Sequence, residues 1–382
     1  MTLYLDYNAS TPLDERVLSA MTDCLAGMPG NPSSTHQFGR VVRAQLDRAR
    51  EQVASLVGVH ASQVIFTSGG TEANNLALHA VTAGYAPTSI AVSAVEHPSV
   101  LEPARALRAS GWQLNEIDVD GQCRVLPEHL KEILKSDTRL VSVMAANNET
   151  GVIQPVAQLA DLARAAGAVF HTDAIQAAGK LPLDFAASGV QLMSLSAHKL
   201  YGPKGVGALV VDKALELAPL QLGGGQEYGL RAGTENIAAI VGFGVAAELA
   251  VEGLQSRAAQ MAALRDRAQA GLQRYPQVTV FAATAERLPN TLQLAVAGLD
   301  GETLLMQLDK AGIAVSSGSA CSSGKTEPSH VLMAMGVEAG LARGAIRISL
   351  GRETTDADID TLLAAFAQQM KWLDKASQVS GW

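Results

Sequence analysis

Short apolar runs alternate with helical stretches over roughly the first 250 residues, and this alternation limits the possible folds more than any other feature. One helical stretch, residues 158–166, carries Leu159, Leu162 and Ala166 at helical spacing. Strands that alternate with helices typically form a mostly parallel sheet with helices on both faces. The apolar runs that we expect to be buried strands are residues 64–67, 90–93, 114–117, 140–145, 168–172 and 206–211.

The pattern changes after about residue 255. A helix with Met261, Leu264 and Leu272 on one face ends at Pro276, and alternating strands follow at 278–281 and 291–296. A last helix begins after Thr355, with Asp358 three residues on. Because 382 residues exceed the usual size of one core, we expect two domains. Residues 13–255 would form a large α/β domain, and residues 1–12 and 256–382 a smaller α+β domain.

The charge of the chain argues against two classes of partner. A net charge of −8 and a pI near 5.5 disfavour nucleic acid and an anionic membrane surface. We expect no signal peptide, and no apolar run reaches the roughly 18 residues of a membrane helix. Three scattered cysteines without a CxxC pair favour a reducing cytoplasm and give little support to a structural zinc site.

The loop around Gly69, Gly70 and Thr71 is the first candidate for chemistry, because ligands bind at the carboxyl ends of strands in such sheets. Two glycines permit a tight turn, and Thr71 would be the N-cap of a helix through Leu78. Backbone N–H groups and a hydroxyl at a helix start can bind a phosphate. The alternative is an ordinary capped helix after a glycine turn.

Two further strand ends carry polar residues. Asp173 and Gln176 could hold a protonated heteroaromatic nitrogen and a neighbouring oxygen, although Asp173 could equally be the N-cap of the next helix. Lys199 follows a strand among small residues, with Ser196 and His198 available for a phosphate. A lysine amine buried near other cations is partly neutral and can form a Schiff base.

Seven segments occur in one order along the chain: TSGGTEANN, EHPSV, NNETGVIQP, DAIQAAGK, SAHKLYGPKGVGAL, GLRAGTEN and SSGSACSS. Together they resemble the NifS/IscS-like cysteine desulfurases, a branch of the class V aminotransferase family. The similarity extends from LDYNASTP to RISLGRETT, nearly the whole chain. It implies PLP fold type I, in which a mostly parallel seven-stranded sheet is joined to a smaller α+β domain. The implied cofactor is pyridoxal 5′-phosphate (PLP).

The resemblance also implies roles for the matching residues. Lys199 would be the Schiff-base lysine, Asp173 would pair with the pyridinium nitrogen, and Gln176 with the ring hydroxyl oxygen. His97 would stack on the ring and assist proton transfer. The phosphate would be held by Gly70, Thr71, Ser196, His198 and, from the second subunit of a homodimer, Thr234. The carboxylate of substrate L-cysteine would be bound by Arg347 and by Asn148, which would also lie against the cofactor.

Cys321 lies in a stretch of small polar residues that is typical of a loop. By resemblance its thiolate would take the sulfur of L-cysteine, release alanine and keep a persulfide for an acceptor protein. That acceptor would serve iron–sulfur cluster assembly or tRNA thiolation. No metal site is implied, although Cys321 could be a transient iron–sulfur ligand. We expect Cys24 and Cys123 to be structural.

Other functions explain the motifs less well. Gly318 to Thr326 resembles a P-loop but has one residue too many before its GKT. A non-enzymatic sulfur carrier would need Cys321 but not Lys199 and Asp173 together. The closest alternative is a cysteine sulfinate desulfinase or selenocysteine lyase of the same fold, which would depend less on Cys321.

Overall fold

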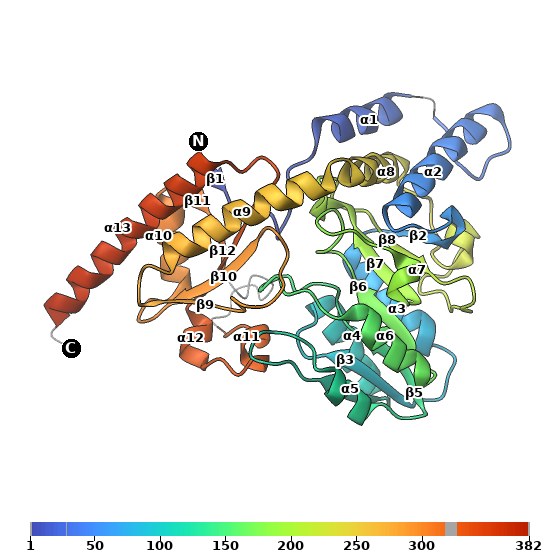
Figure 1. The fold of residues 1–382 in the computed structure, drawn as a ribbon. Helices are drawn as coiled ribbons and strands as arrows, with labels where there is room; N and C mark the ends of the chain where they lie inside the picture. The colour runs from blue at the N-terminus through green and yellow to red at the C-terminus, as the bar shows by residue number, and fades with distance from the viewer. Residues whose placement is uncertain (1, 28, 318–326, 381–382) are drawn as a thin grey trace.

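The computed structural model describes residues 2–27, 29–317 and 327–380, with side chains described as far as Leu373 (Figure 1). Its main sheet has seven strands in the order β2-β8-β7-β6-β5-β3-β4. All neighbours are parallel except β8, which is antiparallel to both β2 and β7. The strands are β2 (Val64–Thr67), β3 (Ser89–Ser93), β4 (Gln113–Ile117), β5 (Thr138–Ser142), β6 (Val169–Asp173), β7 (Leu192–Ser196) and β8 (Gly207–Val211).

Helices cover both faces of this sheet, as the sequence predicts. Along β3, Ala91 packs into one hydrophobic cluster while Ile90 and Val92 pack into another. Successive strand side chains point to opposite faces, so two clusters require cover on each side. The helices of this part are α1 (Glu15–Ala26), α2 (Gln37–Leu56), α3 (Gly70–Thr82), α4 (Pro98–Ala109), α5 (Pro127–Ile133), α6 (Val156–Ala165), α7 (Phe185–Ser188) and α8 (Ile237–Val251).

Strand β7, which leads to Lys199, is not among the six apolar runs, because serines interrupt it. All five of its residues are nevertheless buried. The hydroxyl of Ser194 lies 3.0 Å from the Nε2 atom of His171 on β6, so the buried polar groups satisfy one another.

A second sheet of four strands has the order β12-β13-β10-β9, and β1 pairs in parallel with β11 nearby. In β10, which the sequence predicts as an alternating strand, all six residues are buried, including those of the polar face. The reason is that the polar face meets other parts of the chain: Thr291 contacts Asn8, and Gln293 donates to Glu149. The strands are β1 (Leu3–Tyr4), β9 (Val278–Val280), β10 (Thr291–Val296), β11 (Ile313–Ala314), β12 (Ser316–Ser317) and β13 (Ala345–Ser349).

The helices beside this sheet follow the predicted apolar stripes. Met261, Leu264 and Leu272 are buried on α9 (Leu254–Leu272). Before α13 (Asp356–Ser380), the Thr355 backbone N–H donates to Asp358, whose own N–H donates to the Thr355 hydroxyl. The others are α10 (Gly301–Lys310), α11 (His330–Ala334) and α12 (Ala339–Arg343). The domain limits at residues 12/13 and 255/256 stay a prediction.

No single helix in the described parts of the chain is long and apolar enough to span a membrane. Helices α8 and α9 meet such a criterion only when taken together across a 75° bend.

A buried ion pair fixes the segment between β8 and α8. The two terminal guanidinium nitrogens of Arg50 donate to Glu227 at 2.7 Å, and both side chains are almost fully buried. Glu227 also accepts the N–H of Phe66 on β2. Glu227 and Tyr228 both have left-handed backbone angles, with φ of 46° and 59°. Such angles are unfavourable for residues other than glycine, so the ion pair must hold this turn in place.

Replacing Arg50 with Met should therefore be strongly destabilising. Removal of one partner from a buried pair leaves an uncompensated charge and costs about 3–5 kcal/mol. Arg43→Met on the same helix removes an exposed pair with Asp47, which is worth about 1 kcal/mol or less. Urea unfolding of both variants at one protein concentration measures the difference. Equal losses in the two variants would contradict this role for Arg50.

Candidate active site

One cavity of about 380 Å³ opens at the carboxyl ends of the parallel strands. The sequence-predicted residues that line it are Gly70, Thr71, His97, Asn148, Asp173, Gln176, Ser196, His198, Lys199 and Arg347. Asn8, Ala9, Ser99, Met144, Ala146 and Ile175 complete the wall. Thr234 is exposed and is not part of this lining, and Cys321 lies outside the described residues.

The start of α3 forms one end of the cavity. The helix begins at Gly70, so Gly69 is its N-cap and the prediction that Thr71 caps it is wrong. Gly69 has φ 157° and ψ −179°, a conformation essentially restricted to glycine, and this shifts the helix start. A Cβ atom on Gly70 would lie 2.2 Å from the Cδ1 atom of Ile175, so a larger residue would require the Ile175 side chain to move. Thr71 thus lies in the first turn, still facing the cavity.

Ser196 and His198 lie opposite this helix start. The Ser196 hydroxyl is buried and has no hydrogen-bond partner among the described residues. Burial lowers the pKa of His198 to about 4, with help from the nearby cations Lys199 and Lys204. A neutral His198 can donate one N–H, and the unpartnered Ser196 hydroxyl can donate one hydrogen bond to a ligand. Both groups therefore suit an anion.

Asp173 lies at the end of β6, deeper in the cavity. One carboxylate oxygen accepts the N–H of Ile175 and so caps a turn; the alternative prediction that Asp173 is the N-cap of the next helix is wrong, because that helix begins only at Phe185. The other accepts the side-chain amide of Asn74 on α3 at 2.7 Å. Asp173 is buried and lines the cavity, so capping and ligand binding are compatible here.

His97 is the N-cap of α4, and its Nδ1 atom accepts the N–H of Ser99. This bond requires an unprotonated Nδ1, and burial lowers the pKa of His97. A helix N-terminus also disfavours a positive charge. The ring at the cavity wall is therefore neutral at physiological pH.

The Lys199 amine donates to the backbone carbonyls of Asn8 and Ala9. The Gln176 amide nitrogen donates to the same Asn8 carbonyl, and its oxygen accepts from Lys180. The N-terminal segment therefore forms part of the cavity wall, next to the lysine.

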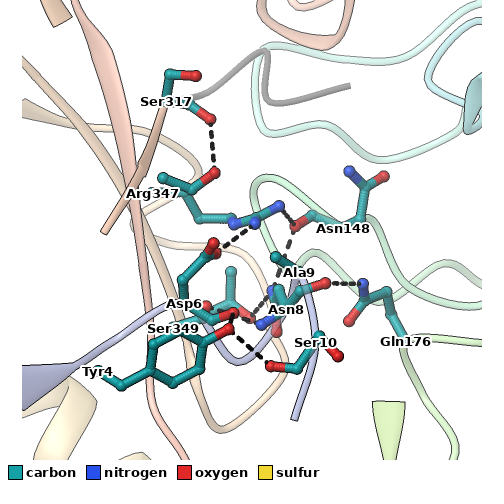
Figure 2. A network of polar contacts seen from close by, with 12 residues as sticks. Tyr4, Asp6, Asn8, Ala9, Ser10, Asn148, Gln176, Ser317, Arg347 and Ser349 are labelled. Atoms are coloured by element: carbon teal, nitrogen blue, oxygen red, sulfur yellow. Dashed lines mark hydrogen bonds and ion pairs between the residues drawn. The ribbon is translucent and has the colours of Figure 1, made fainter. Parts of the chain in front are cut away.

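Arg347 comes from β13 and is almost fully buried (Figure 2). Its guanidinium donates to Asp6 at 2.8 Å and to the Asn148 backbone carbonyl at 3.0 Å. The sequence places Asn148 and Arg347 on one substrate group; the structure brings them together through the Asn148 carbonyl and not its side-chain amide.

The chain meets the cavity on both sides of segment 318–326. Ser316 pairs with Arg347 at the edge of the second sheet. Beyond the segment, the Ser329 hydroxyl donates to the buried Glu149, and the His330 ring lies 3.0 Å from the carbonyl of Glu96, beside His97. Residues on both sides of the segment are thus held near the cavity: Ser316 pairs with the lining residue Arg347, and Ser329 and His330 contact the residues next to Asn148 and His97.

Neither described cysteine is suited to nucleophilic chemistry. Burial raises the pKa of Cys123 to about 12, and that of the partly buried Cys24 also lies above its ordinary value because of burial. Both therefore stay protonated at neutral pH, and only thiolates are good nucleophiles.

Sequence reasoning missed several polar residues of this site. Asn8 is 1% exposed, Asn74 is fully buried, and Asp6 pairs with Arg347. All three lie in the LDYNAS or TSGGTEANN segments, whose resemblance to the family does not by itself imply a role for these residues. For Asn74 the sequence does contain a signal: it lies one helical turn after Gly70, so it is on the same side of the helix as the predicted phosphate loop.

Comparison with known proteins identifies the class. Residues 3–362 match the family model described as "Aminotransferase class-V". The chain therefore belongs to the class V aminotransferase family, whose members are PLP-dependent enzymes.

Within this family the similar proteins are cysteine desulfurases. "Cysteine desulfurase IscS" of Dictyoglomus turgidum is 44% identical over 94% of this chain and 92% of its own length. "Cysteine desulfurase NifS" of Azotobacter vinelandii is also 44% identical, over 94% and 90%. A solved structure entitled "NIFS-LIKE PROTEIN" has a TM-score of 0.92 and 38% identity, and covers 97% of this chain and 100% of its own. These similarities assign the chain to the cysteine desulfurases, as its motifs imply.

The cavity residues fit PLP. The buried Ser196 hydroxyl and the α3 start suit its phosphate, while the Asp173 carboxylate suits a protonated ring nitrogen. A Cβ atom at position 70 would require the end of the Ile175 side chain, which also lines the cavity, to move.

His171, on β6 behind the site, should make stability depend on pH. Burial lowers its pKa to about 3, whereas an unfolded histidine has a pKa near 6.5. Below about pH 6.5, His171 is protonated in the unfolded chain but stays unprotonated in the folded one. Acid therefore favours unfolding. This residue should account for a loss of about 2 kcal/mol in unfolding free energy between about pH 7 and pH 5.

Urea unfolding at the two pH values, for the wild type and His171→Gln, tests this expectation. The variant should lose less stability on acidification, and the comparison cancels the other titrating groups. His60→Gln, at an exposed histidine, is the control and should keep the wild-type pH dependence. An unchanged slope in His171→Gln would refute the assignment.

Proposed function

We propose that this cysteine desulfurase transfers the sulfur of L-cysteine to Cys321 and passes the resulting persulfide to an acceptor protein. The observation that carries the role of Cys321 is the anchoring at both sides of segment 318–326. Cys321 is four residues from Ser317, so an extended chain lets it reach at most about 13–14 Å from there. This reach includes the cavity beside Arg347, with which Ser316 pairs.

The residues that would hold PLP follow from the cavity wall. Lys199 would carry the cofactor, Asp173 would face the ring nitrogen, and Gln176 the ring hydroxyl. His97 would lie against the ring. The phosphate would be bound by Gly70, Thr71, Ser196 and His198.

When bound, PLP supplies an electron sink for the charge left on the substrate α-carbon after loss of its proton. The Lys199 amine, aligned by the Asn8 and Ala9 carbonyls, is placed to take that proton. His97, whose Nδ1 is occupied by the Ser99 N–H, can exchange a proton at Nε2. Arg347 would hold the substrate carboxylate; its Nε atom is buried and has no hydrogen-bond partner among the described residues.

The Cys321 thiolate would attack the substrate sulfur and form an S–S bond. The carbon–sulfur bond of the substrate breaks, and its electron pair stays with the β-carbon, which takes a proton. The products are alanine and a Cys321 persulfide, so the substrate carbon is reduced while sulfur is oxidised and no external reductant is needed.

Cys321→Ser tests this function directly. A serine hydroxyl stays protonated at neutral pH, so sulfide and alanine production from L-cysteine should fall at least about a hundredfold. PLP binding depends on other residues, so the purified variant should keep its visible absorption. Cys24→Ser is the matched control and should retain wild-type turnover.

The same variant distinguishes a cysteine desulfurase from a cysteine sulfinate desulfinase or a selenocysteine lyase of the same fold. Turnover of cysteine sulfinate or selenocysteine, whose carbon–heteroatom bond breaks more readily, should fall much less in Cys321→Ser. Wild-type turnover of L-cysteine in this variant would mean that the enzyme is a lyase that does not use Cys321.

We also propose a homodimer in which Thr234 completes the phosphate site of the other subunit. Three observations support it. Thr234 is exposed on its own chain, and the preceding segment exposes Leu222 and Tyr228 by 83% and 55%. Exposed apolar side chains in one segment are typical of an interface. An ion pair between Arg231 and Glu72 also holds this segment beside the phosphate end of the cavity.

Mixed dimers distinguish a shared site from separate ones. Thr234→Glu should exclude the phosphate by charge repulsion, and Lys199→Ala should remove the cofactor lysine, so each homodimer should be inactive. If Thr234 acts in the partner's site, a mixed dimer of the two variants contains one intact site. It should recover about half the wild-type turnover per dimer. Inactive mixed dimers, or a fully active monomer in sedimentation, would contradict the proposal, and Thr234→Ser is the active control.

The acceptor would be an iron–sulfur scaffold or a tRNA-thiolation protein, because both consume sulfur at this oxidation level. A reducing compartment, the cytoplasm, suits a thiolate nucleophile. Incubation with labelled cysteine and each acceptor identifies the recipient.

A further inference from the structure

Lys180 is a buried lysine that the reaction described above does not use. It follows the DAIQAAG segment, one turn after Gln176, and is 6% exposed. Its amine donates to the Gln176 backbone carbonyl and to the Gln176 side-chain oxygen Oε1, each at 3.0 Å. No carboxylate is hydrogen-bonded to it among the described residues. Both hydrogen bonds of the amine thus go to one neighbouring residue. This is unusual, because lysines are rarely buried without a charged partner.

The hydrogen bonds of Lys180 determine the orientation of the Gln176 side-chain amide, that is, the sides to which its oxygen and its nitrogen point. Both ends of a glutamine amide have similar shapes, but one accepts hydrogen bonds and the other donates. Lys180 uses donor N–H groups, so it holds Oε1 on its own side. Nε2 then points to the opposite side, where it donates to the Asn8 carbonyl at 3.0 Å, next to the Lys199 amine.

We propose that Lys180 is a positioning residue that fixes the Gln176 amide with its N–H end toward the Lys199 side of the cavity. This inference rests on the proposed function, in which Gln176 meets the ring hydroxyl oxygen of PLP. An N–H at that place stabilises the ionised oxygen, whereas a carbonyl oxygen there would repel it.

The arrangement works whether or not Lys180 is charged. Burial, together with the charges of Lys199 and Arg347, lowers the pKa of Lys180 to about 7. A neutral amine still has two N–H groups, which is the number that the two bonds to Gln176 require. A neutral amine also has a lone pair that can accept from an amide N–H, so in that state the Asn8 carbonyl, which requires a donor, keeps Nε2 on the Lys199 side.

The test is a double-mutant cycle of Lys180→Met, Gln176→Ala and the double variant in the PLP-loaded protein. Two quantities are measured: the visible absorption band of the bound cofactor, which reports the ionisation of its ring hydroxyl, and the PLP dissociation constant after reconstitution. Lys180→Met should weaken PLP binding about three- to thirtyfold and change the band as Gln176→Ala does. In the Gln176→Ala background, Lys180→Met should change neither quantity.

Additive effects would overturn the proposal, since they would mean that Lys180 acts directly by its charge. An unchanged band in Lys180→Met would overturn it as well. Lys213→Met, at an exposed lysine, is the control for loss of one positive charge. If Lys180→Met does not fold, as judged by the thermal midpoint of the apoprotein, Lys180→Gln replaces it in the same cycle. Neither readout requires sulfur transfer, so wild-type turnover of L-cysteine in Cys321→Ser, which would contradict the proposed role of Cys321, would leave this result unaffected.

Discussion

The site depends on the complete hydrogen bonding of Asn8. Its backbone N–H donates to Ser349, and its side-chain nitrogen donates to Thr291 and to the Asn148 carbonyl. Asn290 donates to its side-chain oxygen, and Lys199 and Gln176 donate to its backbone carbonyl. A buried polar residue with every group paired is stable only in one arrangement. Asn8 thereby ties the second sheet, the main sheet and Lys199 to a single geometry.

The sequence predicts much of this fold because it relies on repeating patterns. Apolar runs locate most strands of the main sheet, and the carboxyl-end rule directs attention to the loops with Gly70, Asp173 and Lys199. Single buried polar residues such as Asn8 and Lys180 carry no such pattern. Their partners lie far away in the sequence or are brought close by a non-helical turn, so only the folded chain reveals them.

The differences at individual elements have local causes. Thr71 is a good capping residue by type, but the glycine-only backbone at Gly69 starts the helix at Gly70, two residues earlier than a Thr71 cap would. Strand β7 escapes detection because serines interrupt its apolar run, although Ser194 is paired with His171 inside the core. His97 shows that a structural role and a place in the cavity are not exclusive, since one ring nitrogen caps α4 while the ring lines the wall. Cys321 could be predicted only by resemblance and lies outside the described residues.

The bond between Asn8 and Ser349 joins residues 341 positions apart, as does the ion pair between Asp6 and Arg347. During synthesis at about 5–20 residues per second, the N-terminal segment must wait tens of seconds for these partners to leave the ribosome. The main sheet is complete well before then, because its last strand ends at Val211. The wall of the cavity beside Lys199 therefore closes last. Until then the nascent chain has a formed main sheet but an incomplete cavity wall. Premature pairing with another chain is most damaging at this stage.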